Sequence, residues 1–238
     1  MKMKTTINVL LLALCVTSVS FAQSQMFVRY DFRANPGSED AIAKILTDYH
    51  DQAGSYKSGG MSVVRLDVKG ELETTHSIAL LGEIDNFWLE NPTPMTGMQF
   101  ELAGKKLADH IEKETSSAAG YILYSRGDGV EGDTYYAGWL LDVTDPATFA
   151  PSFLKMANSD DTNAIMGDRI LQFGSFAAGG ASVPATHWVY ANFANFVDYM
   201  ATMEQMYASD AFQLHLQEIE GIVKVTREFT EEQIMLFE

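Results

Sequence analysis

The period of the apolar residues distinguishes strands from helices along this chain. Apolar side chains alternate with charged ones across residues 26–33, as in a half-buried strand. Residues 39–49 instead repeat their apolar side chains every three or four positions, as one face of a helix does. Ser38 precedes this run where an N-cap hydroxyl is favoured. By the same criteria the rest of the first half contains strands over 61–68, 74–84 and 120–126, and a second helix over 98–114.

The second half of the chain follows the same order of elements. Asp145 and Pro146 predict the start of a helix, which Pro151 is expected to break one turn later. A Met- and aromatic-rich run predicts one long helix over residues 195–218. Strands are predicted over 135–143, 169–177, 186–190 and 222–227. Each half is therefore predicted to have the order βαββαβ.

Corresponding residues of the two halves lie at a constant interval. Asp142 follows Asp31 by 111 positions, and His187 follows His76 by the same interval, each His preceded by Thr. These matches predict a duplicated chain with a first unit over residues 23–126 and a second over 135–238. Residues 127–134, rich in Gly and Asp, are predicted to be the linker. They match a dinucleotide-binding glycine pattern, but a strand and not a helix follows, so that function is excluded.

A tandem βαββαβ chain of this length resembles the ferredoxin-like, dimeric α/β-barrel superfamily, in the form where two repeats on one chain make the barrel. The resemblance implies an α+β fold whose two antiparallel sheets pack face to face. Members include cofactor-free monooxygenases, haem enzymes of the chlorite dismutase type, isomerases and lyases. The resemblance rests on element order over nearly the whole chain, and it carries no function or catalytic residue with it.

The N-terminus has the parts of a secretory signal peptide. Lys2 and Lys4 precede an apolar run over residues 7–21, and Ala22 ends a small-residue cleavage pattern. We therefore expect residues 1–22 to be removed and the protein to be secreted or periplasmic, without a membrane span. An uncleaved anchor is the alternative. The single cysteine, Cys15, lies within this segment, so the mature chain is expected to contain no thiol or disulfide.

The balance of acidic and basic residues limits the classes of binding partner that are expected. The chain has 32 acidic and 16 basic residues and a formal net charge of −16. Because such a surface repels phosphate backbones, nucleic acid is not an expected partner. A small molecule is the partner we expect, and both a monomer and a homodimer remain open.

Two Asp/His pairs are the candidate catalytic residues. In a ferredoxin-like sheet the first and third strands are adjacent and antiparallel, which brings Asp31 and His76 to one end of the sheet. The second half places Asp142 and His187 in the same way. A carboxylate beside an imidazole suits a general base or a metal-ligating histidine, provided that both side chains share a sheet face. The alternative is that each histidine makes a local hydrogen bond where its strand begins.

Charged and aromatic side chains on the strands are the candidate ligand-binding residues. If the two sheets face each other, these side chains would line a mixed cavity suited to an anionic or polar-aromatic ligand. The alternatives are surface ion pairs and ordinary core packing. The candidates are Arg29, Arg65, Trp139, Trp188 and Tyr190.

Three functions are compatible with this sequence. The first is a secreted or periplasmic small-ligand-binding barrel protein without a catalytic motif and without a cofactor. The alternative is a barrel enzyme, similar to a monooxygenase, lyase or haem protein, that uses the Asp/His pairs; haem or a divalent metal would be its cofactor. The third is an assembly protein whose Met and aromatic residues form an interface.

Overall fold

The computed structural model describes residues 25–179 and 184–238, so the predicted signal peptide lies outside the described residues. The first half contains β1 (Gln25–Ala34), α1 (Glu39–Ala53), β2 (Gly60–Leu66), β3 (His76–Glu83), the 3-10 turn η1 (Ile84–Asn86), α2 (Pro94–Ala108) and β4 (Ile111–Arg126). The second half contains β5 (Tyr135–Val143), α3 (Pro146–Ala157), α4 (Asp160–Met166), β6 (Leu171–Gly179), β7 (His187–Phe193), α5 (Phe196–Ala208), α6 (Asp210–Glu218) and β8 (Val223–Phe237).

The described strands form one closed barrel in the order β1-β3-β2-β8-β5-β7-β6-β4. Within each half the order is that of a ferredoxin-like sheet, β4-β1-β3-β2 and β8-β5-β7-β6, with the first and third strands central and antiparallel. The two sheets join edge to edge through the antiparallel pairs β2–β8 and β4–β6. The predicted α+β barrel is confirmed, and closure removes the exposed edges that an open sheet would have.

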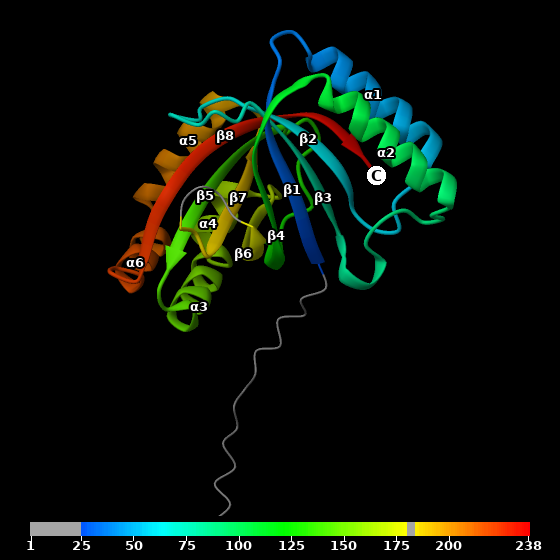
Figure 1. Cartoon of the computed structure of the whole chain (residues 1–238). Coiled ribbons are helices and arrows are strands. Elements are labelled where there is room, and N and C mark those ends of the chain that lie inside the picture. The colour runs from blue at the N-terminus through cyan, green and yellow to red at the C-terminus, as the bar shows by residue number, and fades with distance from the viewer. Residues whose placement is uncertain (1–24, 180–183) are drawn as a thin grey trace, which may run out of the picture.

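Two long strands connect the halves. The first part of β8 pairs with β5 and its last part pairs with β2, where Phe237 packs against His50 of α1. Figure 1 shows β8 running from the side of α5 and α6 to the C-terminus beside α2. In the same way, β4 pairs with β1 over its first part and with β6 over its last part.

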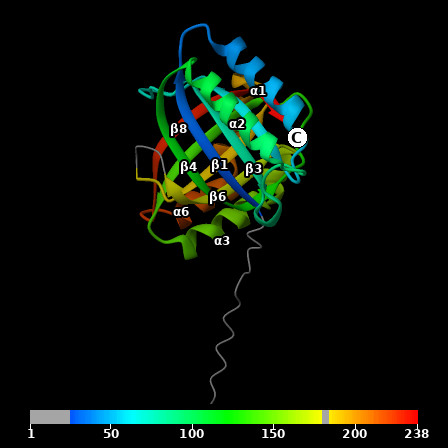
Figure 2. The same cartoon turned by 45° about the vertical axis from the view of Figure 1, so that its right-hand side comes forward.

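The helices cover the outside of the barrel in two groups, with α1 and α2 over the first half and α3 to α6 over the second (Figures 1 and 2). Ile42 of α1 and Leu107 of α2 pack with Phe32 and Val63 from the strands beneath them. The second half has a larger outer core, which includes the fully buried Phe149, Phe173 and Phe193. No helix within the described residues is long and apolar enough to cross a membrane.

Three predicted boundaries were wrong. Residues 111–114 belong to β4 and not to the preceding helix, because pairing with β1 outweighs their helix-favouring sequence. The predicted helix over 195–218 is two helices, since Ser209 ends α5 and its side chain caps α6. Pro151 lies inside α3 without ending it. Proline has no backbone N–H, so the carbonyl of Ala147, one turn earlier, receives no hydrogen bond from it. Both residues are exposed, so this carbonyl can bond to solvent instead.

Of the two predicted helix caps, only Asp145 makes the expected side-chain hydrogen bond. Asp145 caps α3 as expected, accepting the backbone N–H of Thr148 at 3.2 Å. Ser38 occupies the N-cap position of α1, but its side chain makes no cap bond and lies 3.2 Å from His110 Nδ1 instead.

Candidate functional site

The barrel encloses a cavity of about 370 Å³, within the range of small-ligand pockets. All eight strands of the barrel contribute inward-facing side chains to its wall. Most of the lining is apolar, and a group of polar side chains lies on β1, β7 and β8. The larger apolar residues of the wall include Phe27, Val64, Leu66, Leu81, Ile122, Leu140, Phe176, Trp188 and Phe229.

Glycines on the inner face make room for the aromatic rings. A Cβ atom at Gly174 would lie 2.2 Å from Cζ2 of Trp188, so the indole occupies the place that a side chain there would need. A Cβ atom at Gly138 would lie 2.7 Å from Phe229 and 2.8 Å from Tyr190. These distances are too short for any real side chain. The aromatic wall of the cavity therefore depends on glycine at both positions.

Arg29 is the centre of the polar group in the wall. Its Nε–H donates to Asp31 (2.7 Å), while Nη1 donates to the hydroxyl of Tyr190 (2.6 Å) and to Glu231 (3.1 Å). Nη2 donates to Ser77 (2.7 Å) and to the other oxygen of Glu231 (2.8 Å). Because a guanidinium has five N–H donors, Arg29 has no donor left for a ligand in this arrangement. The Glu231 carboxylate, 3% exposed, is held bidentately.

The charges of this group stabilise one another. Burial by itself raises the pKa of Asp31, but the charge of Arg29 and hydrogen bonds from Ser116 and Ser77 (2.5 Å each) outweigh it and hold the pKa below its usual range. Burial also raises the pKa of Tyr190 well above its usual value. Its neutral hydroxyl accepts a hydrogen bond from Arg29 and donates one to a Glu231 oxygen at 3.1 Å.

The structure brings three of the five predicted ligand-binding residues together. Arg29, Trp188 and Tyr190 line the cavity. Arg65 lies on the outside, where it pairs with two surface carboxylates, and Trp139 packs outside against Tyr199 of α5. The sheet period explains this division, since neighbouring strand positions face opposite sides.

The predicted Asp/His pairs do not form. Asp31 lies opposite Ser77 and points into the barrel, whereas His76 lies opposite Phe32 and points outward. His187 lies opposite Leu141 and not Asp142. The premise that Asp and His share a sheet face was wrong, because each pair is one register position out of step.

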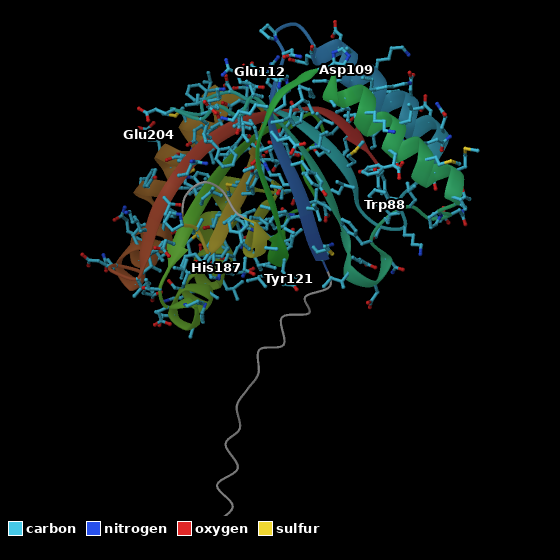
Figure 3. All side chains as sticks on the ribbon, viewed as in Figure 1. Trp88, Asp109, Glu112, Tyr121, His187 and Glu204 are labelled. Carbon is cyan, nitrogen blue, oxygen red and sulfur yellow. The ribbon has the colours of Figure 1, made fainter. Side chains whose placement is uncertain are left out.

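The alternative interpretation of the two histidines is correct. Each is the first residue of its strand, and its Nδ1 lies close to the hydroxyl of the preceding threonine: 2.9 Å for His76 and Thr75, 2.8 Å for His187 and Thr186. The ring of His187, a residue labelled in Figure 3, stacks on Phe173 and contacts Phe149 of α3. Burial lowers the pKa of both imidazoles, so both are neutral packing residues near pH 7.

Two residues of interest were not predicted. The sequence offers no sign that Glu231 would be buried, because it stands in an acidic run beside Glu232. His215 of α6, which the sequence does not single out, is 6% exposed and lies beneath α3. Ser152 donates to Glu218 at 2.6 Å, so the Nδ1–H of His215 donates to Ser152 at 2.8 Å.

The cavity does not fit a haem. Protein-bound haem iron takes a His, Cys, Met or Tyr ligand. No histidine, cysteine or methionine belongs to the cavity wall formed by the described residues. Of its two tyrosines, Tyr190 has its hydroxyl held by Arg29, and burial together with the charge of Glu231 raises the pKa of Tyr136, which disfavours the phenolate that would bind iron. Nor do the described residues contain a cluster of three or more His, Cys, Asp or Glu suited to a metal ion.

No family model and no curated protein sequence matches the chain. Several solved structures do match it in fold. A proposed monooxygenase from Lactobacillus acidophilus matches with a TM-score of 0.58 at 11% identity, covering 90% of this chain and 96% of its own. A proposed monooxygenase from Fusobacterium nucleatum matches with a TM-score of 0.58 at 10% identity, covering 90% and 94%. A mutant chlorite dismutase from Candidatus Nitrospira defluvii matches with 0.52 at 9%, covering 89% and 92%.

The chain has the dimeric α/β-barrel fold. The predicted resemblance is thus confirmed for the fold. Identities near 10% show the fold alone, and members of one fold carry unrelated functions.

Replacing Arg29 with Met is expected to destabilise the protein by about 3–5 kcal/mol at pH 7, because Asp31 and Glu231 would remain buried without their partner. Without Arg29 the pKa of Asp31 rises, so the difference in unfolding free energy between the variant and the wild type becomes smaller as the pH falls from 7 to 4. Urea unfolding measures both effects. Arg65→Met is the control, since that exposed pair should contribute under about 1 kcal/mol. Equal losses for both variants would contradict the prediction.

His215 is expected to make stability depend on pH between about 6.5 and about 4. Burial lowers its pKa to about 4, against a smaller opposite influence of Glu218, so the unfolded chain binds a proton first as the pH falls. The resulting loss is about 3 kcal/mol across this window. His215→Asn retains a donor for Ser152 and should remove most of this slope. Urea unfolding at several pH values measures it, and an unchanged slope would show that His215 is not the group responsible.

Proposed function

We propose that this protein binds a small molecule inside its barrel. The observation that carries the proposal is the cavity of about 370 Å³ within the closed sheet. The interior of an eight-stranded barrel is just wide enough for side chains to fill it, or to hold one small ligand. Here small inward residues, among them Gly60, Ala79 and Ala118, leave that space open. A stably folded barrel without a ligand would be expected to fill it with larger side chains.

The composition of the wall supports a binding site over a structural void. Apolar and aromatic side chains dominate, and a few polar groups converge on one part, as is typical of small-molecule pockets. Arg29, Trp188 and Tyr190, predicted to bind a ligand, form part of this wall. Of the two expected classes, anionic and polar-aromatic, an anionic ligand is disfavoured, because every donor of Arg29 is already bonded within the protein.

The alternative function, an enzyme, rested on two predicted Asp/His pairs, Asp31 with His76 and Asp142 with His187. Neither pair forms, and neither histidine reaches the cavity. The proposed monooxygenases among the similar structures share the barrel, but identities of 10–11% do not allow any catalytic residue to be transferred to this chain. We therefore propose binding without assigning a reaction.

Ala118 and Ala119 allow a matched test of the cavity. They are consecutive and both half-buried, but only Ala118 lines the cavity. The neutral probe N-phenyl-1-naphthylamine is expected to bind the wild type with enhanced fluorescence. Ala118→Phe should weaken this binding roughly tenfold or more, because the ring occupies the ligand volume, whereas Ala119→Phe should bind as the wild type does.

Circular dichroism and thermal unfolding verify that both variants fold. Probe binding that responds equally to both substitutions would place the probe on the outer surface. That outcome, or the absence of any binding, would count against an interior ligand site.

We also propose that the chain is exported. The basic start, the apolar run and the small residues before Gln23 support this, as does the surplus of acidic residues, which keeps a secreted protein soluble. Expression of the full chain in a Gram-negative bacterium should yield a periplasmic product whose N-terminal sequence begins at Gln23. A cytoplasmic product that retains Met1 would contradict export.

A further inference from the structure

The indole N–H of Trp188 is a buried donor without a partner among the described residues. The side chain is only 6% exposed, so bulk water does not serve it. Most buried polar groups in folded proteins are hydrogen-bonded, and an unsatisfied one destabilises the folded state. A Phe at this position would retain the ring without that cost. The unpaired N–H therefore requires an explanation.

Trp188 lies in the wall of the interior cavity. Its ring packs edge-on against Phe27 at 5.3 Å and against Tyr190 at 5.9 Å, and Gly174 leaves the space that the indole occupies. These contacts hold the indole in one place. Its nitrogen has almost no accessible surface in the empty cavity, so an acceptor on a ligand reaches it only if a neighbouring side chain moves aside. A fixed donor among a small number of polar groups is what a pocket uses to orient a ligand.

The neighbouring polar groups are satisfied without a ligand. Arg29 uses its five donors on Asp31, Ser77, Tyr190 and Glu231, and the Tyr190 hydroxyl lies within hydrogen-bond distance of both Arg29 and Glu231. Trp188 differs from them, because its nitrogen is buried and unpaired.

The charges of the wall disfavour an anion. Arg29 and Arg227 line the cavity together with Asp31 and Glu231, so two positive charges are matched by two negative ones, and Glu238 adds a further carboxylate. Asp31 also interacts electrostatically with Arg227. A ligand carboxylate would lose its hydration without meeting an available cation.

We infer that the ligand is a neutral, mostly apolar molecule with a hydrogen-bond acceptor, such as a ketone or ether oxygen, and that Trp188 Nε1 donates to this acceptor. The inference rests on the proposed interior site and names the chemical class that the site takes. It makes Trp188 the residue that distinguishes an acceptor-bearing ligand from the hydrocarbon of the same shape.

Two probes of nearly the same shape test this. Butyrophenone has a ketone where butylbenzene has a methylene, and 4-phenylbutyrate supplies a carboxylate on a similar framework. Each is titrated against bound N-phenyl-1-naphthylamine to obtain its Kd. We expect Trp188→Phe to raise the ratio of the butyrophenone Kd to the butylbenzene Kd by roughly tenfold, because the ketone alone loses its donor. In the wild type, 4-phenylbutyrate should bind at least ~10-fold more weakly than butyrophenone.

Trp139→Phe is the matched control, since that indole packs on the outer face against Tyr199. It should leave the ratio unchanged. A measurement on the wild type keeps the test independent of variant stability. Protein labelled with ¹⁵N-tryptophan contains three indole N–H groups, and butyrophenone should shift one of them downfield while butylbenzene does not.

A ratio that Trp188→Phe leaves unchanged, together with no ketone-specific indole shift, would overturn the inference. The proposed interior site would still stand if Ala118→Phe weakened both neutral compounds. Tighter binding of 4-phenylbutyrate than of butyrophenone would overturn the neutral class. If none of the three compounds displaced the fluorescent probe, the inference would fail, while the Ala118 and Ala119 variants would decide separately whether the cavity binds ligands.

Discussion

The bidentate pair of Arg29 with Glu231 is the interaction on which the interior of this barrel depends. Arg29 comes from β1 and Glu231 from β8, 202 positions later in the chain. A carboxylate that is 3% exposed is costly to bury alone, and the guanidinium offsets that cost only when the barrel is closed. Tyr190 from β7 joins the same group. The polar part of the cavity is therefore made by both halves together.

The two halves differ chemically at corresponding positions inside the barrel, although their strand order is the same. At the interval of 111 positions, Arg29 corresponds to Leu140 and Ser77 to Trp188. At these two positions the first half supplies a cation and its hydroxyl partner, whereas the second half supplies an apolar and an aromatic side chain. Corresponding positions of the two halves therefore contribute different chemistry to the interior of the barrel.

The sequence was sufficient for the fold because periodicity and element order are local properties. Alternation over β1 and the Thr–His starts of β3 and β7 can be recognised without knowledge of the contacts. Which residues meet across the sheet depends on register, and a shift of one position turned the expected Asp31–His76 pair into Asp31–Ser77. The same limit hid Glu231, whose burial is determined by an arginine far away in sequence. Of the candidate ligand residues, those on β1 and β7 line the cavity whereas Arg65 and Trp139 lie outside, because the sequence alone did not show which face of each strand turns inward.

Closure of the sheet also governs how a ligand would enter and leave. Every strand of the barrel is hydrogen-bonded to a neighbour on each side, so no route passes between strands. Exchange is confined to the two ends of the barrel, where Leu72 and Thr74 in the β2–β3 connection line one end of the cavity and Gly59 and Glu238 line the other. The rates of association and release would then be set by the motion of the segments at these two ends, while the sheet itself sets the shape that is recognised.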